Sequence, residues 1–355
     1  MPIESSHRPL TVAVVGATGL VGRTMIKILG ERDFPVGELR PLASRADGRS
    51  IQFGGRDWPV EVTTAGAFEG VDIAIFSAGG GTSKTYAPEA AARGAVVVDN
   101  SSQWRMEPGV PLVVAGVNDE DAAGHEGIIA NPNCSTMQLM PLFKALRDSV
   151  GMERVIVDTY QAVSGSGNKA VVELEEQVRA HVAGEAPVAS VYPHPIAFNV
   201  LPHIDVFLEN GYTKEEWKVV IETRKILHLP DLPVSCTAVR VPVITSHSEA
   251  VHVELTGSMT PDEARELFAR VPGVIVRDDP ANAVYPLPIE GAGRDEVYVG
   301  RIRADASLPW GKGLAFWVVS DNLRKGAATN AVEIAEVVVR NGWLAKASER
   351  AAGAA

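Results

Sequence analysis

The chain has 355 residues, 46% of them hydrophobic, which suggests about two domains with sizeable cores. A formal net charge of −11 without any basic run argues against nucleic acid as a partner. Its 2 cysteines fit a reducing compartment better than a disulfide scaffold, and no apolar run reaches the about 18 residues of a membrane span. Residues 1–10 also lack the apolar core of a signal peptide, so we expect a soluble, cytoplasmic protein that does not contact membranes.

A glycine-rich turn follows the first predicted strand, 11–15. The sequence GATGLVG at 16–22 leads from this strand into an amphipathic helix. Glycines in such a turn let the backbone approach a pyrophosphate, which rests on the N-terminus of the helix. The spacing is GxxGxxG rather than the commoner GxGxxG, and glycine turns also serve plain tight packing. Between a strand and a helix, the turn favours dinucleotide binding.

Strand and helix signals then alternate along the chain. The predicted strands are 39–43, 71–77, 95–99 and 112–114, and a helix is predicted near 86–93, between the second and third of these strands. This order predicts a parallel, doubly wound α/β sheet, whose ligands bind at the carboxyl ends of the strands. Small polar residues gather at such ends, in the runs Ser44-Arg45, Ser77-Ala78-Gly79-Gly80 and Asn100-Ser101-Ser102.

The residues after the second strand bear on the choice of cofactor. An acidic residue there would hold a ribose 2′-hydroxyl, but the chain has Ser44-Arg45, with Asp47 slightly later. A hydroxyl beside a guanidinium suits a 2′-phosphate, so the sequence predicts NADP rather than NAD. The alternative is that Arg45 is simply solvated.

A lone cysteine lies between an apolar run at 127–130 and an amphipathic helix with apolar residues at 139, 142, 143 and 146. In the stretch Asn131-Pro132-Asn133-Cys134-Ser135-Thr136 it would begin the helix. The helix dipole and unpaired backbone N–H groups there favour a thiolate and could stabilise an oxyanion. The alternative is a cysteine buried as a small hydrophobe. The strand-to-helix junction favours Cys134 as a nucleophile.

The second half begins with a strand at 155–160 that runs into the sequence SGSG at 164–167, either a flexible connector or a polar backbone cradle near a cofactor. A helix follows, with valines and a leucine on one face between 171 and 182. Thr213 and Glu216 form a possible capping box for a helix that ends near 227. On it, Glu222 and Lys225 share a face, which by default indicates a surface salt bridge.

Two further residues stand out as candidates for chemistry. Arg240 lies within a predicted strand at 237–243, where a buried arginine usually needs an anionic partner. His247 lies in a polar turn before the strand 251–255, where it is expected to titrate near neutrality. A final strand at 313–320 and an Ala-rich helix at 327–339 are expected to return the chain to the first domain.

Several stretches, in order, now match one family: GATGLVG (16–22), SAGG (77–80), DNSSQWR (99–105), NPNCST (131–136), YQAVSGSG (160–167), ETRKIL (222–227), VRVPV (239–243) with His247, and SDNLRKGAATN (320–330). The chain resembles aspartate-semialdehyde dehydrogenases over nearly its whole length. The resemblance implies NADP-dependent interconversion of aspartyl-4-phosphate and aspartate 4-semialdehyde, on the route to lysine (through diaminopimelate), threonine and methionine.

The predicted fold class is α/β, with a Rossmann-type doubly wound parallel sheet and a second α+β domain for catalysis and dimerisation. The predicted NADP-binding domain comprises 1–133 and 323–355, and the catalytic and dimerisation domain comprises 134–322. The resemblance suggests a homodimer or a tetramer.

The family's functional residues carry over by position. Cys134 would be the acyl-thioester nucleophile, His247 the acid/base and Gln161 the residue that orients the acyl group. Arg240 would bind the substrate α-carboxylate and Glu222 would lie near the amino group. The phosphate would be held by Arg105, Asn133 and Lys225.

The implied cofactor-binding residues are Gly16, Thr18, Gly19, Leu20, Val21, Ser44, Arg45, Ala78, Gly79, Ser164, Gly165 and Asn322, and no metal is expected. The stretch 43–49 is shorter than in many relatives, which leaves open whether Ser44, Arg45 or Arg49 meets the 2′-phosphate.

Two other functions compete with this interpretation. N-acetyl-γ-glutamyl-phosphate reductase carries out similar chemistry, but its relatives favour a glycine before the cysteine, where this chain has Asn133. A non-catalytic NADP-sensing module would keep the fold and have an unreactive thiol, which alkylation with iodoacetamide would reveal.

Overall fold

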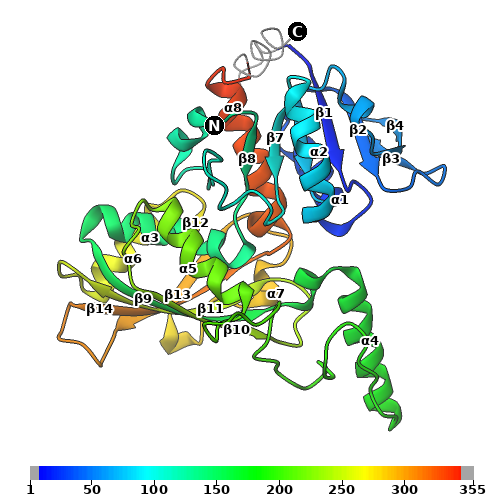
Figure 1. The fold of residues 1–355 in the computed structure, drawn as a ribbon. Coiled ribbons are helices and arrows are strands. Elements are labelled where there is room, and N and C mark those ends of the chain that lie inside the picture. The colour runs from blue at the N-terminus through cyan, green and yellow to red at the C-terminus, as the bar shows by residue number, and fades with distance from the viewer. Residues whose placement is uncertain (1–7, 345–355) are drawn as a thin grey trace. The chain divides into compact units, whose positions relative to one another are not determined.

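The computed structural model describes residues 8–344, which form two compact units (Figure 1). The first unit extends to Pro132 and resumes at Ala327, and the second comprises Asn133–Gly326. The sequence prediction placed these boundaries at 133/134 and 322/323. Among the described residues, no helix is both long enough and apolar enough to cross a membrane.

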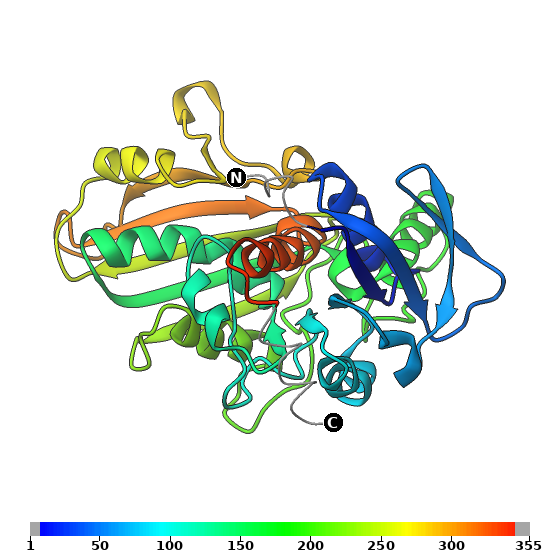
Figure 2. The same ribbon diagram turned by 90° about the horizontal axis from the view of Figure 1, so that it is seen from above.

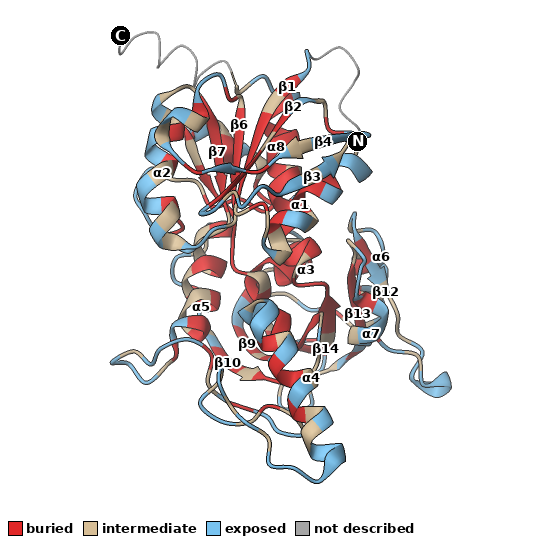
Figure 3. Ribbon diagram, turned by 90° about the vertical axis from the view of Figure 1, so that its right-hand side faces the viewer, coloured by how far each residue is buried: buried red, intermediate tan, exposed pale blue. Residues whose placement is uncertain are grey.

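The first unit contains a 6-stranded sheet in the order β5-β2-β1-β6-β7-β8, in which every pair of neighbours is parallel. Its strands are β1 (Leu10–Val15), β2 (Val36–Ala43), β5 (Glu61–Val62), β6 (Ile73–Phe76), β7 (Val96–Asp99) and β8 (Ile128–Ala130). Every residue of β6 and β7 is buried, because helices cover both faces of the sheet (Figure 3).

Two hydrophobic cores lie on opposite faces of this sheet. In one core, α1 (Leu20–Glu31) and α8 (Asn330–Arg340) pack against the sheet, and in the other, α2 (Gly80–Ala92) packs against it. The C-terminal helix therefore belongs to the first unit, as predicted, and the sheet is doubly wound. A π-helix, Arg324–Thr329, precedes α8 in the stretch that was predicted to begin the α-helix.

The predicted strand at 112–114 is wrong. Leu112 forms only a single bridge to Ala130. Instead, the side chain of Asn118 forms hydrogen bonds with the backbone of this stretch: its Oδ1 accepts from Val114 N at 2.9 Å and its Nδ2 donates to Leu112 O at 2.9 Å. The sequence also missed the hairpin of β3 (Ser50–Phe53) and β4 (Arg56–Pro59).

The second unit is built on a 6-stranded mixed sheet in the order β10-β9-β11-β14-β13-β12. Its strands are β9 (Met152–Gln161), β10 (Val234–Arg240), β11 (His247–Leu255), β12 (Val274–Val276), β13 (Val297–Ala304) and β14 (Gly313–Ser320). Its helices are α3 (Cys134–Ser149), α4 (Asn168–Ala183), α5 (Lys214–Ile226), α6 (Pro261–Ala269) and α7 (Pro288–Gly291). Helices α3, α5 and α6 pack on the same side of the sheet, whereas α4 projects from it (Figures 1 and 2).

Candidate active site

Strand directions in the second unit bring three predicted site residues to one edge of its sheet. Strands β9 and β10 are parallel, and their last residues, Gln161 and Arg240, are paired in register. Strand β11 runs antiparallel to β9, so its first residue, His247, lies at the same edge. The sheet topology therefore gathers side chains that are far apart in the sequence.

Cys134 is the first residue of α3, as the sequence predicted. Asn133 caps the helix through Oδ1, which accepts from Ser135 N at 3.0 Å and from Thr136 N at 3.5 Å. Cys134 is only partly buried. A Cβ added to Gly326 would lie 3.0 Å from the Cβ of Cys134. The backbone at 326 thus leaves room for the cysteine because it carries no side chain.

The sulfur of Cys134 lies 3.3 Å from Nε2 of His247. The other ring nitrogen, Nδ1, accepts a hydrogen bond from Ala162 N at 3.0 Å. A neutral imidazole with an acceptor at Nδ1 carries its proton on Nε2. His247 therefore presents an N–H group to the sulfur rather than a base.

The environment of His247 corrects two sequence-based expectations. The residue begins β11 and is fully buried, rather than lying in a polar turn. Burial, together with the nearby positive charge of Arg240, lowers the pKa of His247 to about 3, and Glu215 only partly opposes this. The ring is consequently neutral near pH 7 and does not titrate there in the free protein.

Arg240 is buried and its guanidinium is incompletely bonded. Nη1 donates to Ala162 O at 2.7 Å, and the guanidinium carbon lies 5.8 Å from the centre of the Tyr192 ring. Nε has no hydrogen-bond partner among the described residues. A buried cation with an unused donor is suited to an anionic ligand, as the strand position predicted.

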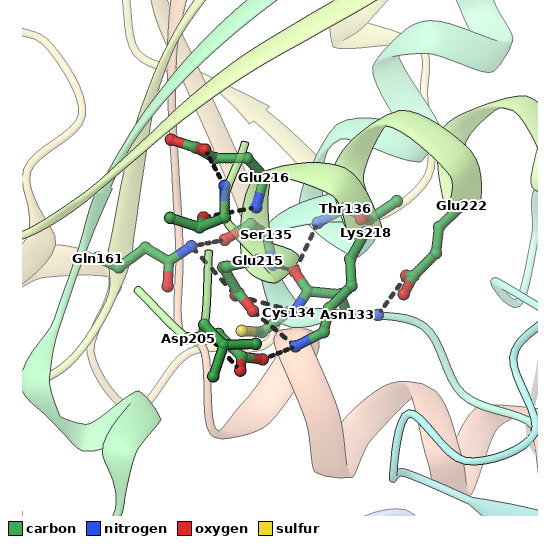
Figure 4. Close-up of polar contacts among 12 residues, drawn as sticks. Asn133, Cys134, Ser135, Thr136, Gln161, Asp205, Glu215, Glu216, Lys218 and Glu222 are labelled. Carbon is green, nitrogen blue, oxygen red and sulfur yellow. Dashed lines mark hydrogen bonds and ion pairs between the residues drawn. The ribbon is translucent and has the colours of Figure 1, made fainter. Parts of the chain in front are cut away.

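Glu222 is buried on α5, so the default interpretation as half of a surface salt bridge is wrong for this residue. Its Oε2 accepts from the backbone N of Asn133 at 2.7 Å (Figure 4). Lys225, one turn further along α5, is partly exposed. The capping box predicted for this helix from Thr213 and Glu216 is confirmed.

Sequence reasoning missed Glu215, a buried residue that contacts the side chains of Asn133 and Gln161. Its carboxylate accepts from Asn133 Nδ2 at 2.9 Å and from Gln161 Nε2 at 3.3 Å. In the sequence it is an ordinary acidic residue in the first turn of a helix, favoured there by the helix dipole. No local signal distinguishes it from a solvated carboxylate.

The glycine turn of the first unit fits a pyrophosphate. Gly16 has φ = +84°, and a Cβ there would lie 2.5 Å from Ser77 O, so the turn packs directly against the end of β6. Gly19 is the N-cap of α1, and it offers no side-chain cap, nor does the first turn contain an acidic residue. The backbone N–H groups from Leu20 and Val21 onward are thus available to an anion.

The remaining predicted cofactor residues of the first unit lie at strand ends. Thr18 belongs to the glycine turn, while Ala78 and Gly79 lead from β6 into α2, of which Gly79 is the N-cap. Ser44 and Arg45 are exposed directly after β2. These positions match the carboxyl ends at which doubly wound sheets bind ligands.

Arg45 and Arg49 differ in their contacts. Arg49 Nη2 donates to Arg45 O at 3.0 Å and forms an ion pair with Asp47 at 3.1 Å. Within residues 8–344, the Arg45 side chain makes neither a hydrogen bond nor an ion pair. Of the two guanidinium groups, that of Arg45 is thus the more available to a ligand.

Three predicted cofactor residues belong to the second unit. Ser164 and Asn322 are hydrogen-bonded to each other, with Asn322 Nδ2 donating to Ser164 Oγ at 3.0 Å. Next to them, a Cβ on Gly165 would lie 3.1 Å from Arg240 Nη1 and 3.3 Å from His247 Cε1. The SGSG loop therefore packs directly against the site, and Gly165 permits this close approach.

Arg105, a predicted phosphate ligand, belongs to the first unit. It is buried, and it donates to Asn131 O at 2.9 Å and to Asn100 O at 3.0 Å. Its side chain is thus held by the carboxyl-end loops of β7 and β8. Among the described residues, no group of three or more histidine, cysteine and carboxylate side chains could hold a metal ion.

Both units match known protein domains. Residues 11–125 match the NAD binding domain of semialdehyde dehydrogenases, and residues 141–325 match their dimerisation domain. The chain therefore has a nicotinamide-dinucleotide-binding domain and a domain of the dimerising type.

Relatives of known name are similar over nearly the full length. Aspartate-semialdehyde dehydrogenase from Aquifex aeolicus is 55% identical over 338 residues, which cover 94% of this chain and 99% of that protein. The Legionella pneumophila enzyme is 52% identical, with coverages of 94% and 96%. The crystal structure of aspartate semialdehyde dehydrogenase II from Vibrio cholerae, complexed with ASA, has a TM-score of 0.91 at 44% identity and coverages of 94% and 99%. The chain therefore belongs to the aspartate-semialdehyde dehydrogenase family, whose members are oxidoreductases of amino-acid biosynthesis.

Proposed function

We propose that the chain catalyses the reversible, NADP-dependent reductive dephosphorylation of L-aspartyl-4-phosphate to L-aspartate 4-semialdehyde through a thioester on Cys134. The observation that carries this mechanism is the Cys134 sulfur at a helix N-terminus, 3.3 Å from the N–H of His247. A coupled assay tests it, with inorganic phosphate, NADP and aspartate semialdehyde expected to yield NADPH. N-acetylglutamate semialdehyde in its place is expected to yield none.

The buried carboxylate of Glu222 supports this choice of substrate over the N-acetylated one. A buried carboxylate favours a charged ammonium group, whereas an acetylated nitrogen has no charge to offer. Arg240 would pair with the α-carboxylate, and Asn133 and Lys225 would hold the phosphate.

The reaction begins when the Cys134 thiolate attacks the acyl carbon of the acyl phosphate. The phosphate leaves with the electron pair of its C–O bond, and a thioester remains on Sγ. When bound, the nicotinamide cofactor supplies the hydride that reduces this thioester. Hydride addition leaves an oxyanion on the thiohemiacetal carbon; the Nε2–H of His247 then donates a hydrogen bond to this oxyanion, while Gln161 orients the acyl group. As the oxyanion re-forms the C=O bond, the C–S bond breaks and its electron pair goes to the sulfur, which releases the aldehyde and leaves the thiolate beside the Nε2–H of His247.

Arg240→Lys is expected to raise the Michaelis constant for the semialdehyde roughly ten-fold or more and to change kcat less. A planar guanidinium can hold Ala162 O and still offer two parallel donors to a carboxylate, whereas an ammonium is a point charge. Steady-state kinetics with varied semialdehyde measure the effect. A variant with unchanged Michaelis constant and a lower melting temperature would show that Arg240 only supports the fold.

Arg45→Ala is expected to weaken binding of NADP roughly ten- to hundred-fold and to leave binding of NAD nearly unchanged, because only NADP carries the 2′-phosphate. Arg49→Ala is the matched control, since Arg49 is already bound to Asp47. Michaelis constants for both cofactors decide the assignment. An equal effect of Arg45→Ala on the two cofactors would contradict it.

A homodimer is the proposed assembly, in keeping with the dimerisation domain matched by the second unit. Helices α3, α5 and α6 pack on one face of its sheet, and on the other face β9 presents exposed side chains, such as Arg154 and Tyr160, which alternate along the strand with buried ones that point toward these helices. Tyr160 packs on Trp317 of β14, with ring centres 5.3 Å apart. We propose this face as the contact surface between two copies. The cytoplasmic location remains a prediction from the sequence.

A further inference from the structure

Two amide side chains flank Cys134, and both donate to one carboxylate. Asn133 Nδ2 lies 2.9 Å from Glu215 Oε1, and Gln161 Nε2 lies 3.3 Å from the same oxygen (Figure 4). The three residues come from the start of α3, the end of β9 and the first turn of α5. Glu215 is therefore the point at which the elements around the cysteine meet.

An ionised carboxylate fixes the orientation of both amides, because it accepts hydrogen bonds and donates none. Asn133 must turn its NH₂ group to Glu215, which leaves Oδ1 to cap α3 at Ser135 N. Gln161 must likewise turn Nε2 inward, where it also donates to Ser135 Oγ at 2.7 Å. Its carbonyl oxygen then faces away from the carboxylate. A reversed amide would set oxygen against oxygen.

The surroundings of Glu215 keep it charged. Burial raises its pKa, but Lys218, Asn133 and Arg240 outweigh burial, so that the pKa falls to about 2. Lys218 Nζ lies 2.9 Å from Glu215 Oε2 and 3.0 Å from Asp205. Glu215 thus remains an acceptor at every pH at which the enzyme would operate.

The carboxylate of Glu215 is not needed to cap its own helix. Thr213 and Glu216 form the capping box of α5, in which Thr213 N donates to Glu216 Oε2 at 2.6 Å. The other oxygen of Glu216 accepts from Ala238 N at 2.9 Å. Neighbouring buried glutamates on one helix therefore have different partners: Glu216 holds backbone, and Glu215 holds the side chains beside Cys134.

We propose that Glu215 is a positioning residue for the thioester chemistry, which holds the amides of Asn133 and Gln161 in the orientation that acyl and phosphate groups require. The inference rests on the proposed role of Cys134. Glu215 lies outside the stretches that match the family, such as 222–227, and it can act on the reaction without touching the substrate.

Glu215→Gln is expected to lower kcat roughly ten- to hundred-fold, because a misplacement of about 1 Å at a reacting centre can cost a hundred-fold in rate. The amide has one acceptor oxygen where the carboxylate has two, so it cannot accept from Lys218 on one side and from Asn133 and Gln161 on the other, and the charge that attracts Lys218 is lost. Glu216→Gln is the matched control. It should lower the melting temperature and leave kcat near the wild-type value.

A second variant tests the role even if Glu215→Gln folds poorly. In Lys218→Met the carboxylate loses its counter-ion, so the pKa of Glu215 should rise. Activity should then fall as the pH is lowered through the new pKa, because the protonated carboxyl can donate and no longer dictates the amide orientation. The double variant Glu215→Gln/Lys218→Met should lack this acid limb. A merely structural role predicts the same pH profile for all of these proteins.

The outcomes separate this inference from the proposed function. If Cys134→Ser, measured in parallel, kept its turnover, the thioester mechanism would fail on its own. If Cys134→Ser were inactive but Glu215→Gln kept the wild-type kcat, and Lys218→Met gained no acid limb, only the role of Glu215 would be overturned.

Discussion

Turnover of Cys134→Ser is expected to fall by roughly 10⁴-fold or more, a loss typical of removing a covalent nucleophile. The geometry explains why serine cannot substitute. Nε2 of His247 carries the ring proton, because Ala162 N donates to Nδ1, so it cannot take a proton from a serine hydroxyl. A thiol is intrinsically far more acidic than a hydroxyl, and a helix N-terminus favours the thiolate. Steady-state assays of NADPH formation measure the loss.

Cofactor binding should survive in Cys134→Ser, because the glycine turn of the first unit is independent of the thiol. Fluorescence titration with NADPH checks this. The control is Cys236→Ser on β10, whose buried thiol has a pKa raised well above its ordinary value, first by burial and then by nearby carboxylates such as Glu249. That thiol is inert, so its replacement should leave turnover intact. An equal loss in both variants would refute the assignment of Cys134.

The first unit could be predicted well because its signals are local. Strands buried on both faces appear as short apolar runs, and their order along the chain determines a parallel sheet. The wrong strand at 112–114 arose where a side chain replaced backbone pairing. Residues 112–114 are as apolar as a strand, yet Asn118 bonds their backbone groups from a few residues away.

The site was predictable only in part. Cys134 and Arg240 could be recognised because a residue type conflicts with its position, a thiol at a helix start and a cation in a strand. Glu215 shows no such conflict, since its partners at 133 and 161 are distant in sequence. The same limit applies to His247, whose pKa depends on burial and on Arg240 rather than on its neighbours in the chain.

The acid stability of the protein offers a test of the buried, neutral state of His247. Its pKa is about 3 in the folded protein and about 6.5 in an unfolded chain. Between these values the unfolded state binds a proton that the folded state does not, so stability falls as the pH drops below about 6.5. His247→Gln should lose less melting temperature between pH 7 and pH 5 than the wild type does. A larger loss would contradict the neutral state.

The same variant, His247→Gln, is expected to lower kcat roughly 10²–10⁴-fold with little change in the Michaelis constant, because the N–H of His247 acts on groups that form only during reaction. Since the free enzyme keeps this ring neutral, kcat/KM of the wild type should show no limb from His247 between pH 5 and 8. A substrate carboxylate at Arg240 would remove one cause of the low pKa of His247, so any limb from His247 is expected in kcat and not in kcat/KM. Profiles of both parameters against pH decide this. If His247→Gln retained the wild-type kcat, the acid/base role would pass from His247 to another group, and Glu222 is the next candidate because its carboxylate is buried at the same helix start.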